Sequence, residues 1–288
     1  MFLLDSAGRL FKDEIGRTIF HSICEEGNVE KLEVAINVSN LSKLEYTEND
    51  SKGNTPLHFA VLCKNFQFTQ MLIEHVSYLL NYDVEKILLF LISTNAFGIM
   101  PLHYCCKSNN LQIMQLIINK IMVCINNDYE RMKVVLSTQN NNNISFLYIA
   151  ILNQNLDMVK LLLDNGANIN EIITTNNVTP LQFSIQIGNL EILRELLRRG
   201  ADVDLIDIYG NTALHYACRF YMGNIGLINL LIRYIAEESK YNKKSIEDYI
   251  YQVNDEDDTA TDIAEEFGFT EIIDYFSPDE PWLTVVEN

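Results

Sequence analysis

One four-residue phrase recurs along the chain, and four of the five histidines end a copy of it. The copies that contain histidine are Thr18–His21, Thr55–His58, Met100–His103 and Thr212–His215, and three degenerate copies are Ser145–Tyr148, Thr179–Gln182 and Thr259–Asp262. A phrase that returns seven times in 288 residues indicates a repeat architecture, in which each unit packs on its neighbours. The histidines are therefore expected to be structural rather than catalytic.

Each phrase belongs to a longer pattern. A lead-in of the form Asp-x-x-Gly-x-Thr precedes it at Asp13, Asp50 and Asp207. A leucine-rich segment follows it, most clearly over 155–170 and 189–204, where apolar residues recur at i, i+3 and i+4 and a glycine follows the last of them. This spacing predicts a second helix with one apolar face.

The phrase itself has the composition of a helix start, because Thr55 can cap a helix and Pro56 and Pro101 suit its first turn. Together the motifs resemble the ankyrin repeat, a unit of about 33 residues in which T-P-L-H-x-A opens the first of two helices. The resemblance covers residues 13–276. It implies an all-α fold, an ankyrin-repeat solenoid of about seven helix–turn–helix units joined by short hairpin turns.

The copies are unevenly spaced. Measured from the third residue of each phrase, the steps are 37, 45, 45, 34, 33 and 47 residues, so three units carry 12 to 14 extra residues. The extra segments lie within 76–94, 121–138 and 236–252, resemble one another and contain neither glycine nor proline. Their composition predicts an inserted helix or a lengthened outer helix in each unit. Two interpretations stay open: a ridge that widens a partner surface, or a duplicated unit that kept its insert.

These boundaries define the expected organisation. The solenoid is expected to span 1–276, followed by an acidic tail at 277–288. The predicted units lie near 13–49, 50–94, 95–139, 140–173, 174–206, 207–253 and 254–276.

Charge and composition narrow the kinds of partner. The chain has a net charge of −18, and the residues from Glu237 to Asn288 include 16 acidic and 3 basic ones. A nucleic-acid partner is disfavoured because such partners need a basic face, whereas an acidic end suits solubility or a basic protein surface. Without a visible secretory signal or apolar run of about 20 residues, we expect an intracellular, cytoplasmic protein with no membrane span. The six cysteines are expected to be reduced, small and buried.

Other chemistry is weakly supported. His21, His103 and His215 each precede a cysteine by three residues, but this spacing is inherited from the repeat, so no metal or cofactor is expected. The run 255–258 is interpreted as the charged lead-in of the seventh unit rather than as a calcium loop. Trp282 either caps the last repeat or serves as a short docking peptide.

The resemblance also implies where a partner binds, because ankyrin proteins use their lead-in tips and the ends of their first helices, which line a concave groove. Many of the corresponding positions are apolar here, and exposed apolar surface usually marks a binding site. The alternative is that the inserted helices cover this surface. The predicted partner-binding residues are Lys52, Asn54, Phe97, Ile99, Lys107, Asn142, Ile144, Leu152, Asn153, Val178, Ile187, Ile208, Tyr209, Asn211, Arg219 and Phe220.

The functional expectation is a non-catalytic module that binds another protein through this groove. No segment outside the repeats is long enough for a catalytic domain, which disfavours the rival class, a repeat-bearing enzyme or toxin. A structural or self-associating scaffold is the third class. The Asn- and Ile-rich composition also resembles ankyrin effectors of intracellular bacteria, which would place the protein in a host cytoplasm.

Overall fold

A computed structural model describes residues 12–38, 47–220, 225–242 and 246–276. The elements in these ranges are helices, and the β-structure found there is one isolated antiparallel bridge between Val253 and Thr259. The all-α prediction is confirmed. The chain divides into two compact bodies, Met1–Ala167 and Asn168–Asn288, which are described separately.

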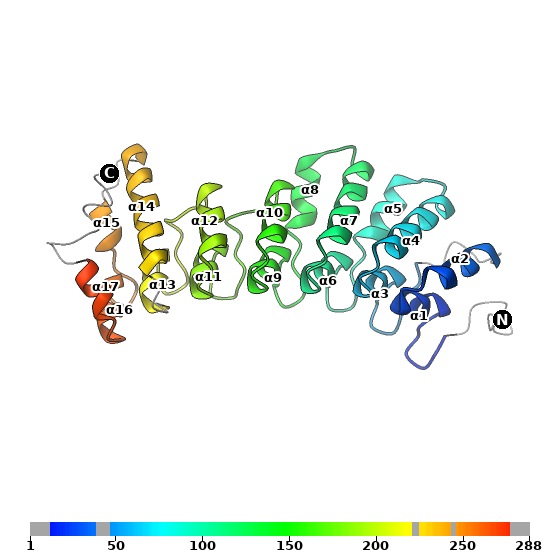
Figure 1. Cartoon of the computed structure of the whole chain (residues 1–288), viewed down its shortest axis with the longest axis horizontal. Coiled ribbons are helices and arrows are strands. Elements are labelled where there is room, and N and C mark those ends of the chain that lie inside the picture. Colours follow the sequence, from blue (N-terminus) through cyan, green and yellow to red (C-terminus); the bar gives the residue numbers. More distant parts are fainter. Residues whose placement is uncertain (1–11, 39–46, 221–224, 243–245, 277–288) are drawn as a thin grey trace. The chain divides into compact units, whose positions relative to one another are not determined.

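The N-terminal body consists of four helix pairs with two added helices. The inner helices α1, α3, α6 and α9 pack side by side, and the outer helices α2, α4, α7 and α10 form a second row (Figure 1). The bounds are α1 (Ile19–Glu26), α2 (Val29–Val38), α3 (Pro56–Leu62), α4 (Phe66–Leu79), α5 (Val84–Leu91), α6 (Pro101–Lys107), α7 (Leu111–Cys124), α8 (Tyr129–Leu136), α9 (Phe146–Leu152) and α10 (Leu156–Asp164).

The C-terminal body repeats this arrangement. Its inner helices α11, α13 and α16 pack in sequence, α12 packs on α14, and α15 packs on α14. The bounds are α11 (Pro180–Gln186), α12 (Leu190–Arg198), α13 (Ala213–Arg219), α14 (Ile225–Asn242), α15 (Ile246–Ile250), α16 (Ala260–Glu266) and α17 (Thr270–Tyr275).

Short polar side chains set where the helices begin. Asn65, Asn110, Asn155 and Asn189 cap α4, α7, α10 and α12, and each side-chain oxygen accepts a hydrogen bond from the backbone N–H three residues later. Such caps satisfy amide groups that have no partner within the helix. The apolar stripe of each outer helix then faces the inner row, as the sequence predicts; Leu162 and Leu196, for example, are buried.

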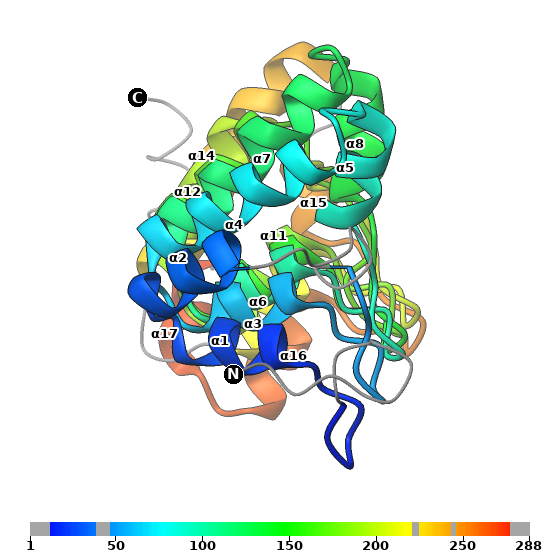
Figure 2. The ribbon, with the colours of Figure 1, turned by 90° about the vertical axis from the view of Figure 1, so that its right-hand side faces the viewer.

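The prediction of added helices is confirmed in all three enlarged units. The inserts form α5, α8 and α15, and the outer helices α4, α7 and α14 are longer than α10 and α12. Asp83 and Asp128 cap α5 and α8 at equivalent positions of the two inserts. Figure 2 shows α5 and α8 beside α7 and away from α1, α3 and α6, so these inserts thicken the outer row.

Each lead-in forms a tight turn that requires a left-handed residue. Gly53 has φ 78°, and a Cβ atom there would lie 2.8 Å from the backbone nitrogen of Ala96 in the next turn. Asn143 and Asn177 replace this glycine and adopt φ 59°, because asparagine tolerates the left-handed region. The turn survives in both places.

Candidate functional site

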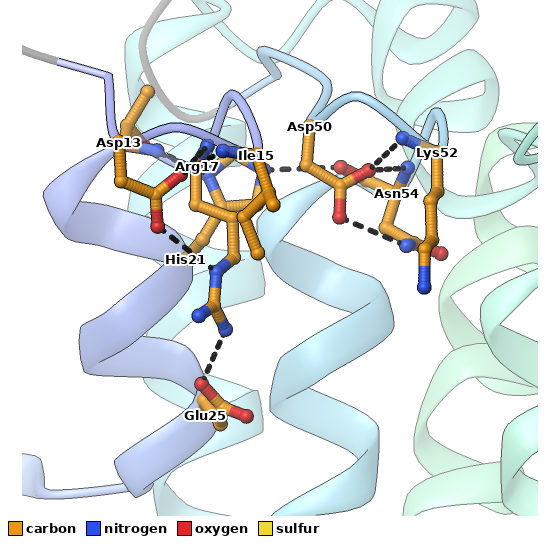
Figure 3. A network of polar contacts seen from close by, with 9 residues as sticks. Asp13, Ile15, Arg17, His21, Glu25, Asp50, Lys52 and Asn54 are labelled. Carbon is orange, nitrogen blue, oxygen red and sulfur yellow. Dashed lines mark hydrogen bonds and ion pairs between the residues drawn. The ribbon is translucent and has the colours of Figure 1, made fainter.

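A hydrogen-bonded turn of one design positions every lead-in tip. The side-chain oxygen of its first residue accepts the backbone N–H groups two and four residues later, as Asp13 does from Ile15 and Arg17 and Asp50 from Lys52 and Asn54 (Figure 3). Asn95, Asn140, Thr174, Asp207 and Asn254 repeat the arrangement. These bonds hold each tip in one conformation.

Neighbouring tips are joined through their backbones. The amide of Ala96 donates to the carbonyl of Lys52 at 2.9 Å, and the amide of Asn141 donates to that of Phe97 at 3.0 Å. In the C-terminal body, Ile208 donates to Asn176 and Asp255 to Tyr209, each at 3.0 Å. Within each body, these neighbouring tips therefore lie in register, and the recognition face is defined for each body separately. With the last turns and C-caps of the inner helices they form what we call the recognition face.

The phrase histidines tie this face to the helices behind it. The Nδ1 atom of His58 accepts the backbone N–H of Thr55 at 3.1 Å, and its Nε2 atom lies 2.9 Å from the carbonyl oxygen of Ile99 in the next repeat. Because a carbonyl oxygen only accepts, Nε2 carries a proton. Because Nδ1 accepts a backbone N–H, it carries none, so the ring is neutral. His21, His103 and His215 make the same pair of contacts. In each, Nδ1 accepts the backbone N–H three residues earlier, and Nε2 contacts a backbone carbonyl of the next repeat, that of Asn54, Ile144 or Asp258 respectively.

Burial keeps these rings neutral. Desolvation lowers the pKa of His58 and of His103 to about 4, although the carbonyl contact at Nε2 acts in the opposite direction. The pKa values of His21 and His215 are lowered for the same reason. A second proton on Nδ1 would also face the backbone N–H that it now accepts. The prediction that the four histidines have a structural role agrees with these contacts.

Four of the cysteines are enclosed in the core and have suppressed thiolate character. Cys24, Cys105, Cys106 and Cys218 are free and buried, and burial raises the pKa of each thiol. Within the described ranges, no cluster of three or more His, Cys, Asp or Glu side chains could hold a metal ion.

Metal analysis offers a direct test of the histidine assignment. We expect the purified full-length protein, dialysed without chelator, to contain less than about 0.1 zinc per chain by mass spectrometry, because both ring nitrogens are already engaged in hydrogen bonds. One tightly bound zinc per chain that disappears in a His103→Gln variant would contradict it.

Many of the predicted contact residues are accessible on the recognition face. Phe97 is 54% exposed and Tyr209 is 51% exposed. The other exposed ones are Lys52, Lys107, Asn142, Leu152, Asn153, Ile208 and Arg219, whereas Ile99, Ile144, Ile187 and Phe220 are half-buried. Since Phe97 and Leu152 are exposed while α5 and α8 pack on the outer helix α7, these two inserts do not cover the face.

Three predicted residues are buried, which corrects the expectation that their positions face solvent. Asn54 donates to Asp50 and accepts from Asn95 of the next repeat at 2.8 Å. Asn211 likewise links Asp207 and Asn254, and Val178 occupies the same position of its own turn. This position directly precedes the N-cap residue of the inner helix, and in the third and fourth repeats it holds the half-buried Ile99 and Ile144.

The predicted partner-binding residues leave out the contact positions of the seventh repeat. Asp255 and Glu256 are its tip, equivalent to Ile208 and Tyr209, and they are exposed. Glu266 ends α16 where Arg219 ends α13, and Phe267 caps α16 as Phe220 caps α13. The lead-in at 254–259 is the sequence signal that points to these positions. Trp282 lies outside the described residues.

The inserts carry a second exposed apolar surface. Tyr78, Val84 and Leu89 recur 45 residues later as Val123, Tyr129 and Val134, and all six side chains are exposed. Arg131 of α8 pairs with Glu85 of α5 at 3.7 Å, so the two inserts are neighbours. This surface lies on the outer row and is distinct from the recognition face.

Comparison with known proteins identifies the repeats by family. The profile described as ankyrin repeats in three copies matches residues 2–85, 75–173 and 169–245. No curated protein matches the chain in sequence. In the ranges described, no helix is both long and apolar enough to cross a membrane.

Solved structures show the same fold. The ankyrin repeat domain of Bcl-3, a member of the IkappaB family, superposes with a TM-score of 0.65 at 19% identity, over 90% of this chain and 99% of that one. The human ASB11 ankyrin repeat domain gives 0.57 at 19% identity, over 94% and 97%. An ankyrin repeat domain from Acinetobacter baumannii AYE gives 0.58 at 20% identity, over 75% and 97%.

Proposed function

The chain belongs to the ankyrin-repeat family, and from this premise we propose that it is a non-catalytic module that binds a partner protein through the recognition faces of its two bodies. Ankyrin repeats are protein–protein interaction modules, and ankyrin-repeat proteins are typically non-enzymatic scaffolds. The observation that carries the proposal is the exposure of large apolar side chains on rigidly held tips, above all Phe97 and Tyr209.

The protein acts by binding its partner on this surface, without a chemical reaction. Turns fixed by side-chain oxygens and joined tip to tip give a surface that loses little conformational entropy on binding. The contact residues are the predicted ones without Asn54, Val178 and Asn211, which support the face from behind. The protein then holds, blocks or recruits the partner that fits.

The rival classes remain distinguishable. A repeat-bearing enzyme or toxin would require a catalytic group, and the buried thiols and hydrogen-bonded histidines do not favour one. A self-associating scaffold would show a concentration-dependent mass in light scattering. We also propose that the protein acts in the cytoplasm, or in the cytoplasm of a host cell. The solenoid is proposed to end near residue 276 and to be followed by an acidic tail.

Replacing the two exposed aromatic residues provides the test. We expect Phe97→Ser and Tyr209→Ser each to weaken partner binding by about 30-fold or more, because anchors of this kind dominate interface energies. Thermal stability should change by no more than about 0.5 kcal/mol, as for other surface sites. The measurement is a pull-down identified by mass spectrometry, followed by titration of the captured partner.

Tyr82→Ser and Tyr251→Ser are the matched controls, since both tyrosines are exposed and belong to the inserts rather than to a tip or the end of an inner helix. They should retain the partner. A partner that is lost with Tyr82→Ser but kept with Phe97→Ser and Tyr209→Ser would move the binding site to the inserts and refute the proposal.

A further inference from the structure

The recognition face of the C-terminal body carries exposed apolar side chains at its sixth tip and at the end of α16. Ile208 and Tyr209 at the sixth tip and Phe267 at the end of α16 are all exposed. The carbonyl of Tyr209 accepts the amide of Asp255 in the seventh tip, and the Arg219 guanidinium lies 6.0 Å from the centre of the Phe267 ring. The sixth tip and the end of α16 therefore both expose large apolar side chains, the kind of surface that usually contacts a partner.

Acidic residues accompany both groups of apolar side chains. Asp255, Glu256 and Asp257 occupy the seventh tip, and Glu265 and Glu266 end α16; all five are exposed. None of these carboxylates forms an ion pair with another described residue. The tips and inner helices of this body, 174–188, 207–220 and 254–268, contain one Lys or Arg, which is Arg219.

The end of α16 makes this charge unfavourable within the fold. A helix C-terminus carries a partial negative charge, which lysine or arginine usually offsets. The last turn of α16 contains no basic residue and instead holds Glu265 and Glu266. A cation supplied from outside would offset both the carboxylates and the helix end. The comparable last turn of α13 carries Arg219.

We propose that this part of the recognition face binds an extended segment of the partner protein in which lysine or arginine residues alternate with apolar anchors. The apolar side chains of the segment pack on Tyr209 and Phe267, and its cations face Glu256, Glu265 and Glu266. The inference rests on the proposed function and adds the chemical class of the partner. Complementary charge of this kind sets specificity and the rate of association.

A synthetic segment tests the inference with the full-length chain. The probe is a fluorescent peptide, (Lys-Leu-Lys-Tyr)₃, and its charge-inverted counterpart is (Glu-Leu-Glu-Tyr)₃; binding is measured by anisotropy at low and high salt. We expect the basic peptide to bind and the acidic one not to bind, with weaker binding at high salt. Equal binding of both peptides would overturn the proposal.

Variants separate a site from general attraction to an acidic protein. Glu265→Gln with Glu266→Gln should weaken binding about 10-fold, and Tyr209→Ser about 30-fold. The matched controls are Glu30→Gln with Glu33→Gln, exposed acids of α2, and Tyr251→Ser; they should stay within about twofold. Equal losses in both glutamine pairs, with no effect of Tyr209→Ser, would show diffuse attraction and overturn the inference.

The captured partner distinguishes this inference from the function on which it rests. If the Tyr209→Ser variant loses the partner while the Glu265→Gln/Glu266→Gln variant keeps full affinity, the recognition face binds a partner that is not basic, and only the inference fails. If Phe97→Ser and Tyr209→Ser both keep the partner, the proposed function fails as well. Light scattering that shows dimers dissociated by the basic peptide would make a second copy the occupant and overturn the assignment to a partner.

Discussion

Lowering the pH from 7 to 5 is expected to reduce the free energy of unfolding by about 4 kcal/mol through His58 and His103 alone. Each ring is buried and has a pKa of about 4 in the folded chain, against 6.5 as the ordinary value. The unfolded chain therefore binds more protons at pH 5. The contribution of these two neutral rings to the free energy of unfolding is fully present above pH 6.5. It is lost as the pH falls from 6.5 towards 4, by about 2 kcal/mol for each histidine at pH 5.

A natural substitution within the chain provides the control. Gln182 occupies the histidine position of the fifth repeat, where its Oε1 atom accepts the N–H of Thr179 at 2.9 Å and its Nε2 atom donates to the carbonyl of Asn211 at 3.1 Å. Urea unfolding of a His58→Gln/His103→Gln variant should therefore show a pH dependence smaller by about 4 kcal/mol. An unchanged dependence would mean that these rings already titrate in the folded chain near pH 6.5.

Replacing Phe146 by alanine is expected to cost about 3–5 kcal/mol of stability. Its side chain has 0% exposure, and its ring centre lies 4.2 Å from that of His103. The substitution removes apolar surface from the contact between α6 and α9 and leaves a cavity there. Urea unfolding at pH 7, followed by circular dichroism, measures the loss.

Phe97→Ala is the matched change, because it removes the same atoms from a side chain that is 54% exposed. It should alter stability by about 0.5 kcal/mol or less. Similar losses for the two variants would show that Phe97 belongs to the core, and the proposed binding face would then have to exclude it.

The repeats, the caps and the added helices could be predicted from the sequence because each depends on neighbouring residues. Thr55 and Pro56 precede an apolar run and start α3, as a threonine followed by a proline commonly does at a helix N-terminus. Asp83 and Asp128 each cap an insert helix. The insert segments contain no residue that breaks a helix. Such features require no knowledge of distant contacts.

The recognition face was predicted less well because exposure depends on the next repeat. Asn54 resembles a surface residue in its own turn, but it is buried and accepts a hydrogen bond from the Asn95 side chain, 41 residues later. The pairs Asp50/Asn54 and Asp207/Asn211, each followed by an asparagine in the next lead-in, were the available signal. Val178 gives no such signal, since a valine can face solvent or core at that place.

The hydrogen bond from each phrase histidine to a carbonyl of the next repeat has nearly the same length, although the number of residues between the two partners varies. The bond from His21 spans 33 residues, those from His58 and His103 span 41, and that from His215 spans 43, yet all measure 2.9–3.3 Å. The inserts therefore change the length of the chain without changing the contact between successive repeats. Loops such as the turn at Asn81 and Tyr82 are consequently tolerant attachment points, where a tag or a cleavage site can be introduced while the tips keep their pitch.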